Sequence, residues 1–190
     1  KEKRNPFQPL VDLDEYSPDY SLYHPDRFLR AVGGNIVRSI NLESYRGCPY
    51  SCTFCNSPMT RTLDKNYLRR KSLDVLRKEI ESYIELYEPD YFFFVDDCWL
   101  ARPKREVYAL CDMMAEFKIP WWCNTRIENV DDELLFAMKE GYCDRVQYGI
   151  ECGNDEYRKN ILKRNVTNEE YESKIPIINN SGIPYGLNII

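Results

Sequence analysis

The sequence predicts an α/β protein built around a parallel sheet, and two repeating patterns support this class. The first is a set of short apolar runs with the length and composition of buried strands. The second is a set of intervening segments whose apolar residues recur at helical spacing. Strand and helix alternate five times, as expected for parallel strands joined by right-handed crossovers. The alternation does not distinguish a barrel from an open doubly wound sheet.

The expected strands are short, apolar and followed by polar residues. The clearest, Tyr91 to Val95, is continuously apolar, as expected of a strand covered on both faces. The five expected strands span residues 35–44, 91–95, 121–126, 146–150 and 185–190.

The expected helices carry recognisable start and stop signals. Thr167 and Glu170 have the spacing of a capping box, and Pro176 is expected to kink or shorten the helix that they begin. The five expected helices run from Ser72 to Pro89, from about Pro103 to Pro120, from Asp131 or Asp132 to Gly141, from Asp155 to Lys163 and from Thr167 to Gly182.

Residues 1–35 differ from the remainder because they are rich in Pro, Asp and Tyr. We expect a linker or extended arm there, with Gly33-Gly34 in a turn, and one core domain over residues 36–190. The chain opens at Lys1 with neither an initiator Met nor a signal sequence, so we expect it to be a piece cut from a longer protein.

Composition excludes several classes of partner and compartment. The 26 basic and 31 acidic residues give a formal net charge of -5, so no basic footprint indicates nucleic-acid binding. No apolar run approaches the length of a membrane span. Eight cysteines without a targeting segment indicate a reducing compartment, and we expect a cytoplasmic protein.

One loop carries the strongest chemical signal. Its run RGCPYSCTFCNSP places Cys48, Cys52 and Cys55 at spacing C-x-x-x-C-x-x-C. Three thiolates on one loop can each bind an iron of a cubane cluster, and Cys98 is too remote in sequence to be the expected fourth ligand. One iron would stay open to a bound molecule, as in catalytic rather than structural metal sites. Zinc is the weaker alternative because the single histidine, His24, stands apart.

This loop resembles the motif C-x-x-x-C-x-aromatic-C of the radical S-adenosylmethionine (SAM) superfamily, with Phe54 in the aromatic place. The longer run RGCPYSCTFCN is most similar to the subgroup that carries a cobalamin-binding domain, and it is also similar to the methylthiotransferases. The resemblance implies a partial, six-stranded parallel β/α barrel, truncated here after about the fifth strand. A truncated barrel exposes a strand edge, so we expect companion segments in the native protein or unusual packing.

The resemblance also implies an enzyme and its cofactors. In the family, three cysteines hold a 4Fe-4S cluster, the open iron binds SAM, and reductive cleavage gives a 5′-deoxyadenosyl radical. The subgroup implies cobalamin bound by a domain outside this chain, assisting a methylation or a rearrangement of a small-molecule or peptide substrate. An electron donor such as flavodoxin or ferredoxin is the implied partner.

Polar residues follow the predicted strands, where β/α barrels place their chemistry. They are Asp96 and Asp97, Asn124 with Arg126, and Glu151. The ammonium, carboxylate and ribose hydroxyls of SAM call for carboxylates and a cation, and these residues supply both.

The family resemblance assigns roles to some of these positions. The backbone around Phe54 matches the segment that passes the adenine, and Asp96–Asp97 stand where many members contact the SAM amine through a G-G-E motif. Arg126 resembles an arginine that binds the SAM carboxylate, and Glu151 resembles a residue near the ribose. Alternatively, the two aspartates cap a turn, and Arg126 and Glu151 pair with each other or with surface charges.

Two other functions remain open at this level. One is a methylthiotransferase-like enzyme that modifies tRNA, and the other is a non-catalytic iron-sulfur or zinc-binding module. The identity of the bound metal discriminates the enzymes from the zinc module.

Overall fold

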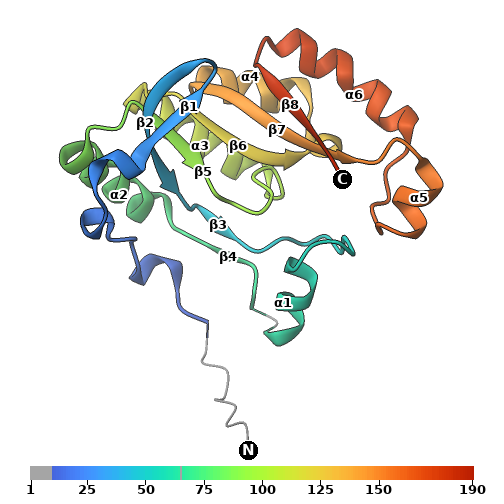
Figure 1. Cartoon of the computed structure of the whole chain (residues 1–190), viewed down its shortest axis with the longest axis horizontal. Coiled ribbons are helices and arrows are strands. Elements are labelled where there is room, and N and C mark those ends of the chain that lie inside the picture. The colour runs from blue at the N-terminus through green and yellow to red at the C-terminus, as the bar shows by residue number, and fades with distance from the viewer. Residues whose placement is uncertain (1–9, 65) are drawn as a thin grey trace, which may run out of the picture.

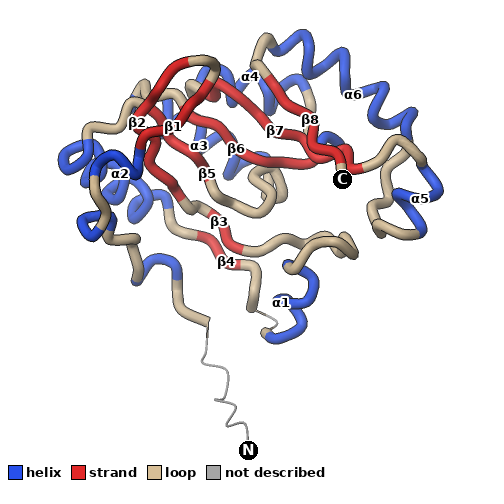
Figure 2. Tube along the Cα trace, in the orientation of Figure 1, coloured by secondary structure: helices blue, strands red, loops and turns tan. Residues whose placement is uncertain are grey.

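A computed structural model describes residues 10–64 and 66–190 and places a curled sheet at the centre of the molecule (Figures 1 and 2). The strand order is β1-β2-β5-β6-β7-β8. The last five strands are parallel, and β1 (Leu29–Val32) pairs antiparallel with β2. The curled, mostly parallel sheet forms a half barrel, which confirms the predicted fold class.

Each of the five predicted strands is present. The fourth, β7, begins three residues earlier than predicted because Cys143, a polar-flanked residue, pairs with Trp121. The parallel strands are β2 (Asn35–Leu42), β5 (Tyr91–Phe94), β6 (Trp121–Arg126), β7 (Cys143–Glu151) and β8 (Tyr185–Ile189).

The predicted helices begin at the expected caps. The hydroxyl of Ser72, the carboxylate of Asp131 and the hydroxyl of Thr167 each accept a hydrogen bond from the backbone three residues later. The helices are α2 (Leu73–Tyr87), α3 (Lys104–Phe117), α4 (Asp132–Glu140), α5 (Asp155–Asn160) and α6 (Asn168–Ser181).

Of the two effects expected of Pro176, a kink or a shortening of the last helix, the shortening is wrong, because α6 continues to Ser181. A proline inside a helix removes one hydrogen bond. Here the residues beyond it are held by burial of Ile178, which is 1% exposed, and by Gly182, whose φ of 67° ends the helix as predicted.

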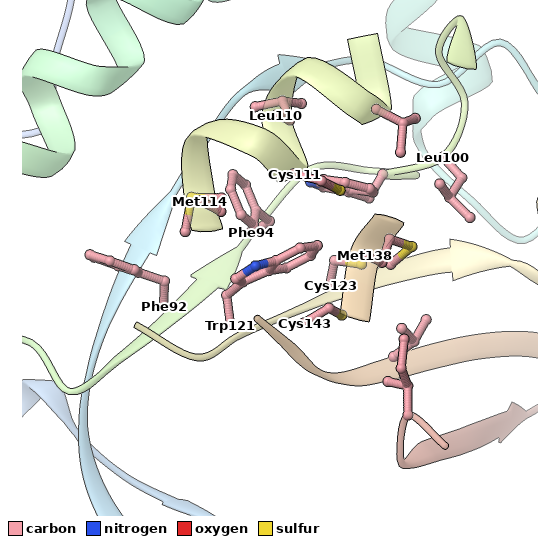
Figure 3. Packing of buried hydrophobic residues seen from close by; sticks show 14 of the residues in the cluster. Phe92, Phe94, Leu100, Leu110, Cys111, Met114, Trp121, Cys123, Met138 and Cys143 are labelled. Atoms are coloured by element: carbon pink, nitrogen blue, oxygen red, sulfur yellow. The ribbon is translucent and has the colours of Figure 1, made fainter. Parts of the chain in front are cut away.

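The main core lies between one face of the sheet and the helices (Figure 3). Phe92, Phe94, Trp121 and Cys123 project from neighbouring strands toward Leu110, Met114 and Met138 on α3 and α4, a set that the figure labels. Burying a side chain of this size contributes about 1.5–3 kcal/mol. Because side chains alternate along a strand, Phe93 and Trp122 project from the opposite face of the sheet.

The predicted arm is more structured than a linker where the structure describes it. Residues 10–28 contain three short 3-10 helices: η1 (Leu13–Glu15), η2 (Tyr20–Leu22) and η3 (Pro25–Phe28). The rings of Tyr20 and Phe28 pack on Tyr83 and Tyr87 of α2. Residues 1–9 of the arm lie outside the described residues.

The expected boundary after residue 35 falls inside a hairpin. Strand β1 and strand β2 are joined by Gly33-Gly34, whose φ angles of 57° and 85° confirm the predicted turn. The hairpin adds an antiparallel strand that the sequence did not signal, because Leu29–Val32 lacks an alternating pattern with a buried face.

Three further elements beside the cysteine loop were not predicted. Strands β3 (Tyr45–Arg46) and β4 (Arg69–Arg70) form a separate antiparallel pair, and α1 (Ser57–Leu63) follows the loop. In Figure 1 they lie apart from the curled sheet. Two-residue strands carry no measurable periodicity, so the sequence offers no signal for them.

The last strand leaves an open edge, as expected. In β8, Leu187 is 41% and Ile189 is 72% exposed. Among the described residues, no helix has both the length and the apolar character to cross a membrane.

Candidate functional site

The cysteine loop follows β3 beyond the carboxyl end of β2. Cys48 is half-buried, Cys52 is buried and Cys55 is exposed, and all three carry free thiols. The other five cysteines are Cys98, Cys111, Cys123 and Cys143, which are buried, and Cys152, which is half-buried. Most of these five cysteines pack as small apolar side chains. The three cysteines of the loop are therefore the candidate metal ligands.

The entrance of the loop is tied to the end of β5. The carboxylate of Asp97 accepts a hydrogen bond from the backbone N–H of Gly47 at 3.0 Å. Gly47 has a φ of 101°, and a Cβ there would lie 3.0 Å from the carbonyl oxygen of Tyr67. Only glycine fits this backbone without strain, so the loop enters at a fixed angle.

Asp96 also holds this segment, from a fully buried position. Its Oδ1 accepts from the backbone of Ser44 at 2.8 Å and of Tyr45 at 3.1 Å. Its Oδ2 accepts from the Ser44 hydroxyl at 2.5 Å and from Nη2 of Arg102 at 2.6 Å. Burial raises the pKa of Asp96, while Arg102 and the hydrogen bonds from Ser44 oppose that shift.

These bonds bear on the predicted SAM contacts. Four donors fill the acceptor sites of the Asp96 carboxylate, so no site remains on it for the amine of SAM. In this structure Asp96 positions the backbone before the loop, and its contact with SAM stays a prediction that requires one of these four donors to move. Asp97 is exposed, and its carboxylate accepts a hydrogen bond from the backbone of Gly47. A contact between Asp97 and the SAM amine stays a prediction.

The exit of the loop is tied to α1 and to the segment after α5. The backbone N–H and the hydroxyl of Thr53 donate to the carbonyls of Leu162 and Ile161 at 3.1 and 2.7 Å. Arg61 of α1 donates to the carbonyls of Cys48 and Pro49. The loop is thus held on both sides by bonds that do not involve its thiols.

Arg126, at the end of β6, contacts the loop directly. Its Nη1 lies 3.3 Å from Sγ of Cys52, and its guanidinium carbon lies 3.8 Å from the centroid of the Tyr50 ring. Tyr50 donates to Oδ1 of Asn129 at 2.6 Å. Burial disfavours the charge, but the carboxylate of Glu128 raises the pKa of Arg126, which stays cationic.

A chain of alternating charges continues from Arg126 along the strand ends. Arg126 pairs with Glu128, and Nη2 of Arg164 lies 3.4 Å from the other oxygen of Glu128. Nη1 of Arg164 lies 2.9 Å from Glu151, whose pKa is raised by burial against the opposing effect of Arg164. Arg126 and Glu151 thus each form an ion pair, but with the largely buried side chains of Glu128 and Arg164 rather than with each other or with surface charges.

The two central residues of this series of alternating charges, Glu128 and Arg164, were not predicted from the sequence. Glu128 lies two residues after Arg126, and that spacing at a strand end is the one available signal. Arg164 is 36 residues from Glu128 and gave no signal, because the fold alone brings the two together. Asn129, which accepts a hydrogen bond from the Tyr50 hydroxyl, was not predicted for the same reason.

The donor chemistry of the loop fits an iron-sulfur cluster. Three thiols lie within eight residues, with a guanidinium at Cys52 and the backbone N–H of Ser57 at 3.4 Å from Sγ of Cys55. Both neighbours are hydrogen-bond donors to the sulfur. Among the described residues, no three Cys, His, Asp or Glu side chains already converge as a metal site, so binding requires the thiols to move together. Burial raises the pKa of Cys48 to about 12, so metal binding there releases a proton.

Comparisons with known proteins agree with this geometry. The family model of the radical SAM superfamily matches residues 42–190. An uncharacterized methyltransferase of Pyrococcus horikoshii is 29% identical over 157 residues, which cover 81% of this chain and 33% of the relative. The anaerobic magnesium-protoporphyrin IX monomethyl ester cyclase of Rubrivivax gelatinosus is 22% identical over 179 residues, covering 92% of this chain and 31% of the relative.

Solved structures share the fold. The cobalamin-dependent SAM radical enzyme OxsB matches with a TM-score of 0.67 at 18% identity, covering 79% of this chain and 23% of that one. The radical SAM methyltransferase TsrM of Kitasatospora setae matches with a TM-score of 0.63 at 16% identity, covering 78% and 29%. This chain spans about a third of the length of the relatives it matches.

The family match covers most of the chain, including the cysteine loop and the parallel strands β5 to β8. The resemblance carried by the cysteine motif is therefore confirmed, and with it the expectation of an enzyme. The chain belongs to the radical SAM superfamily.

Proposed function

We propose that this chain is the catalytic core of a cobalamin-assisted radical SAM enzyme, with methyl transfer as its reaction. The observation that carries the proposal is the cysteine loop fixed at the carboxyl ends of the strands, with Arg126 against Cys52. Relatives named as methyltransferases and neighbours named as cobalamin-dependent support the subtype. Cobalamin itself would be held outside this chain.

In this proposal Cys48, Cys52 and Cys55 hold a 4Fe-4S cluster with one open iron. The chemistry supplied by that group is reductive cleavage of SAM to methionine and a 5′-deoxyadenosyl radical. The chain orients the bound molecules and keeps water away from them. Thr53 and Arg61 support this role, since both hold the loop backbone without using a thiol.

The strand ends supply groups that match the parts of SAM. Arg126 offers a cation for the carboxylate, and the exposed carboxylate of Asp97 suits the amine. Glu151 lies at the end of β7 for the ribose hydroxyls, and Phe54, which is 46% exposed, brings its backbone toward the adenine. A small-molecule or peptide substrate and an electron donor such as flavodoxin or ferredoxin complete the proposal.

The alternatives receive less support. The formal net charge of -5 and the acidic strand-end residues do not favour a tRNA-modifying enzyme. A closed zinc module needs a fourth protein ligand, and the next cysteine in sequence, Cys98, is buried and contacts Thr125 and Asn129.

The test is anaerobic reconstitution with iron and sulfide, followed by reduction in the presence of SAM. The proposal expects about four irons and four sulfides per chain, and formation of 5′-deoxyadenosine together with methionine. Cys55→Ala should abolish both, and Cys111→Ala, which changes a buried core thiol, should retain both. Zinc without sulfide, or a cluster that leaves SAM intact under reduction, would overturn the proposal.

A further inference from the structure

The face of the sheet turned away from the helical core, here called the open face, carries side chains that neither the fold nor the cluster loop uses. In β5 and β6, Phe92, Phe94 and Trp121 point into the core, and the alternate residues Phe93 and Trp122 lie on the open face. Both are half-buried, although their neighbours in the core are fully buried.

Phe93 and Trp122 form a stacked pair. They are register partners on adjacent strands, with ring centroids 4.0 Å apart and an angle of 15° between the planes. The other two tryptophans, Trp99 and Trp121, are 0% exposed, so Trp122 alone among the three offers ring surface to a ligand. Asn41 of β2 is the register neighbour of Phe93 and Arg145 of β7 that of Trp122, so the half-exposed surface of the pair is what a further flat ring can contact.

An unpaired guanidinium stands beside this pair. Arg145 of β7 is the register partner of Trp122. No ion pair joins Arg145 to any acidic residue in the described part of the chain, and its Nε is buried without a hydrogen-bond partner. A Cβ on Gly33, in the β1–β2 turn, would lie 3.1 Å from its Nη2, so the turn confines this side chain. A half-buried cation without a carboxylate is costly unless an anion binds it.

Amide side chains lead from this point toward the cysteine loop. Asn124 and Gln147 are register partners two residues further along β6 and β7. Gly186 of β8 leaves the room that Gln147 fills, since a Cβ there would lie 2.2 Å from its Oε1. Two residues further come Arg126 and Gly149, which belong to the candidate site. At about 3.3 Å per residue, the path from Arg145 to Gly149 is roughly 13 Å long.

We propose that the open face binds the substrate, and that the substrate is a planar aromatic or heteroaromatic molecule carrying an anionic group such as a carboxylate. Its ring joins the Phe93–Trp122 stack, and its anion pairs with Arg145. The rest of the molecule then extends along Asn124 and Gln147 toward the strand ends. The inference rests on the proposed function for the reaction that follows binding, but binding itself needs no cluster.

The test uses three probes with the same two-ring carbon skeleton: naphthalene-2-carboxylate, the uncharged naphthalene-2-carboxamide, and decahydronaphthalene-2-carboxylate, which lacks an aromatic ring. Each is titrated calorimetrically into the whole 190-residue chain, before and after anaerobic reconstitution. The proposal expects naphthalene-2-carboxylate to bind at least tenfold more tightly than either of the others, in both forms of the protein.

Variants assign the binding to the proposed residues. Arg145→Gln should remove the tenfold advantage of the carboxylate over the carboxamide, and Arg145→Lys should keep part of it. Trp122→Leu should weaken both naphthalene probes at least fivefold. Arg105→Gln, which changes an exposed arginine on α3, should change nothing. Circular dichroism and thermal melting confirm that each variant is folded.

The outcomes separate this inference from the proposed function. Suppose that naphthalene-2-carboxylate binds saturably and the variants behave as expected, but the protein assembles no iron-sulfur cluster. That result would support the assignment of the open face as the substrate surface and refute the radical chemistry. A functional cluster with no saturable binding of naphthalene-2-carboxylate, or with equal affinity for acid and amide, would overturn the substrate assignment alone.

Discussion

Nη1 of Arg126 lies 3.3 Å from Sγ of Cys52, so the end of β6 contacts the middle thiol of the cysteine loop directly. The guanidinium is held from its other side by Glu128 and lies over the ring of Tyr50. Arg126 of the sheet thereby helps to position the loop, and the ion pair with Glu128 fixes the orientation of the Arg126 side chain. The strand ends and the loop form one unit.

Glu128→Gln should strongly destabilise the chain. The substitution leaves Arg126 and Arg164, both buried, without their shared carboxylate. Breaking a buried ion pair from one side typically costs about 3–5 kcal/mol. The matched control is Glu133→Gln, whose exposed pair with Lys104 should contribute less than about 1 kcal/mol. Urea unfolding measures both, and equal losses for the two variants would show that the charge chain is not structural.

Asp96→Asn and Asp97→Asn should differ although the residues are adjacent. Asn at position 96 leaves Arg102 without its buried carboxylate, at a cost of about 3 kcal/mol in unfolding free energy. Asn at position 97 weakens one hydrogen bond to Gly47, at a cost of about 1 kcal/mol. The second variant should instead lose affinity for SAM. Equal stability losses would contradict the positioning role assigned to Asp96.

Gly149→Ala should disturb the site without straining the backbone. The new Cβ would lie 2.1 Å from Oε1 of Glu151, so that carboxylate must move away from Arg164. The expected loss is about 1–3 kcal/mol of unfolding free energy. Gly153→Ala is the control, because no atom lies within 4 Å of its added Cβ. A stable Gly149→Ala variant would mean that the Glu151–Arg164 pair tolerates displacement.

The sequence predicted the elements whose signals are local. Ser72, Asp131 and Thr167 cap helices where expected, and Trp121–Arg126 is a strand with the predicted bounds. It did not predict the β3–β4 pair, since two-residue strands exist only through their contacts with each other.

In the candidate site, too, residues with a local sequence signal were predicted and residues brought together by the tertiary fold were not. The three cysteines are recognisable from spacing, whereas the partners of Arg126 and Glu151 are set by the tertiary fold. Asp96 and Asp97 received the same prediction from the sequence, but adjacent residues in a sequence do not share an environment. Asp96 is 2% exposed and Asp97 projects into solvent.

Alkaline pH should destabilise the packing of the arm on α2. Burial raises the pKa of Tyr20 from 10.0 to about 12, with Glu79 and Glu43 adding to the shift. The folded chain therefore holds this proton more tightly than the unfolded chain, so its contribution is complete below pH 10 and is lost as the pH rises toward 12. Tyr20→Phe should make the fall in unfolding free energy between about pH 9 and pH 11.5 shallower.

The control for that titration is Tyr16→Phe, because the Tyr16 side chain is 58% exposed. It should leave the pH dependence of unfolding unchanged. A Tyr20→Phe variant with the slope of the parent chain would show that the phenol of Tyr20 ionises equally in both states.

The most direct test of the central claim is electron paramagnetic resonance of the reduced, anaerobically reconstituted chain, recorded with and without SAM. We predict a 4Fe-4S signal that SAM perturbs, that Cys52→Ala eliminates and that Cys111→Ala preserves. A signal indifferent to SAM, or one that survives in Cys52→Ala, would contradict the assignment of an open iron to this loop.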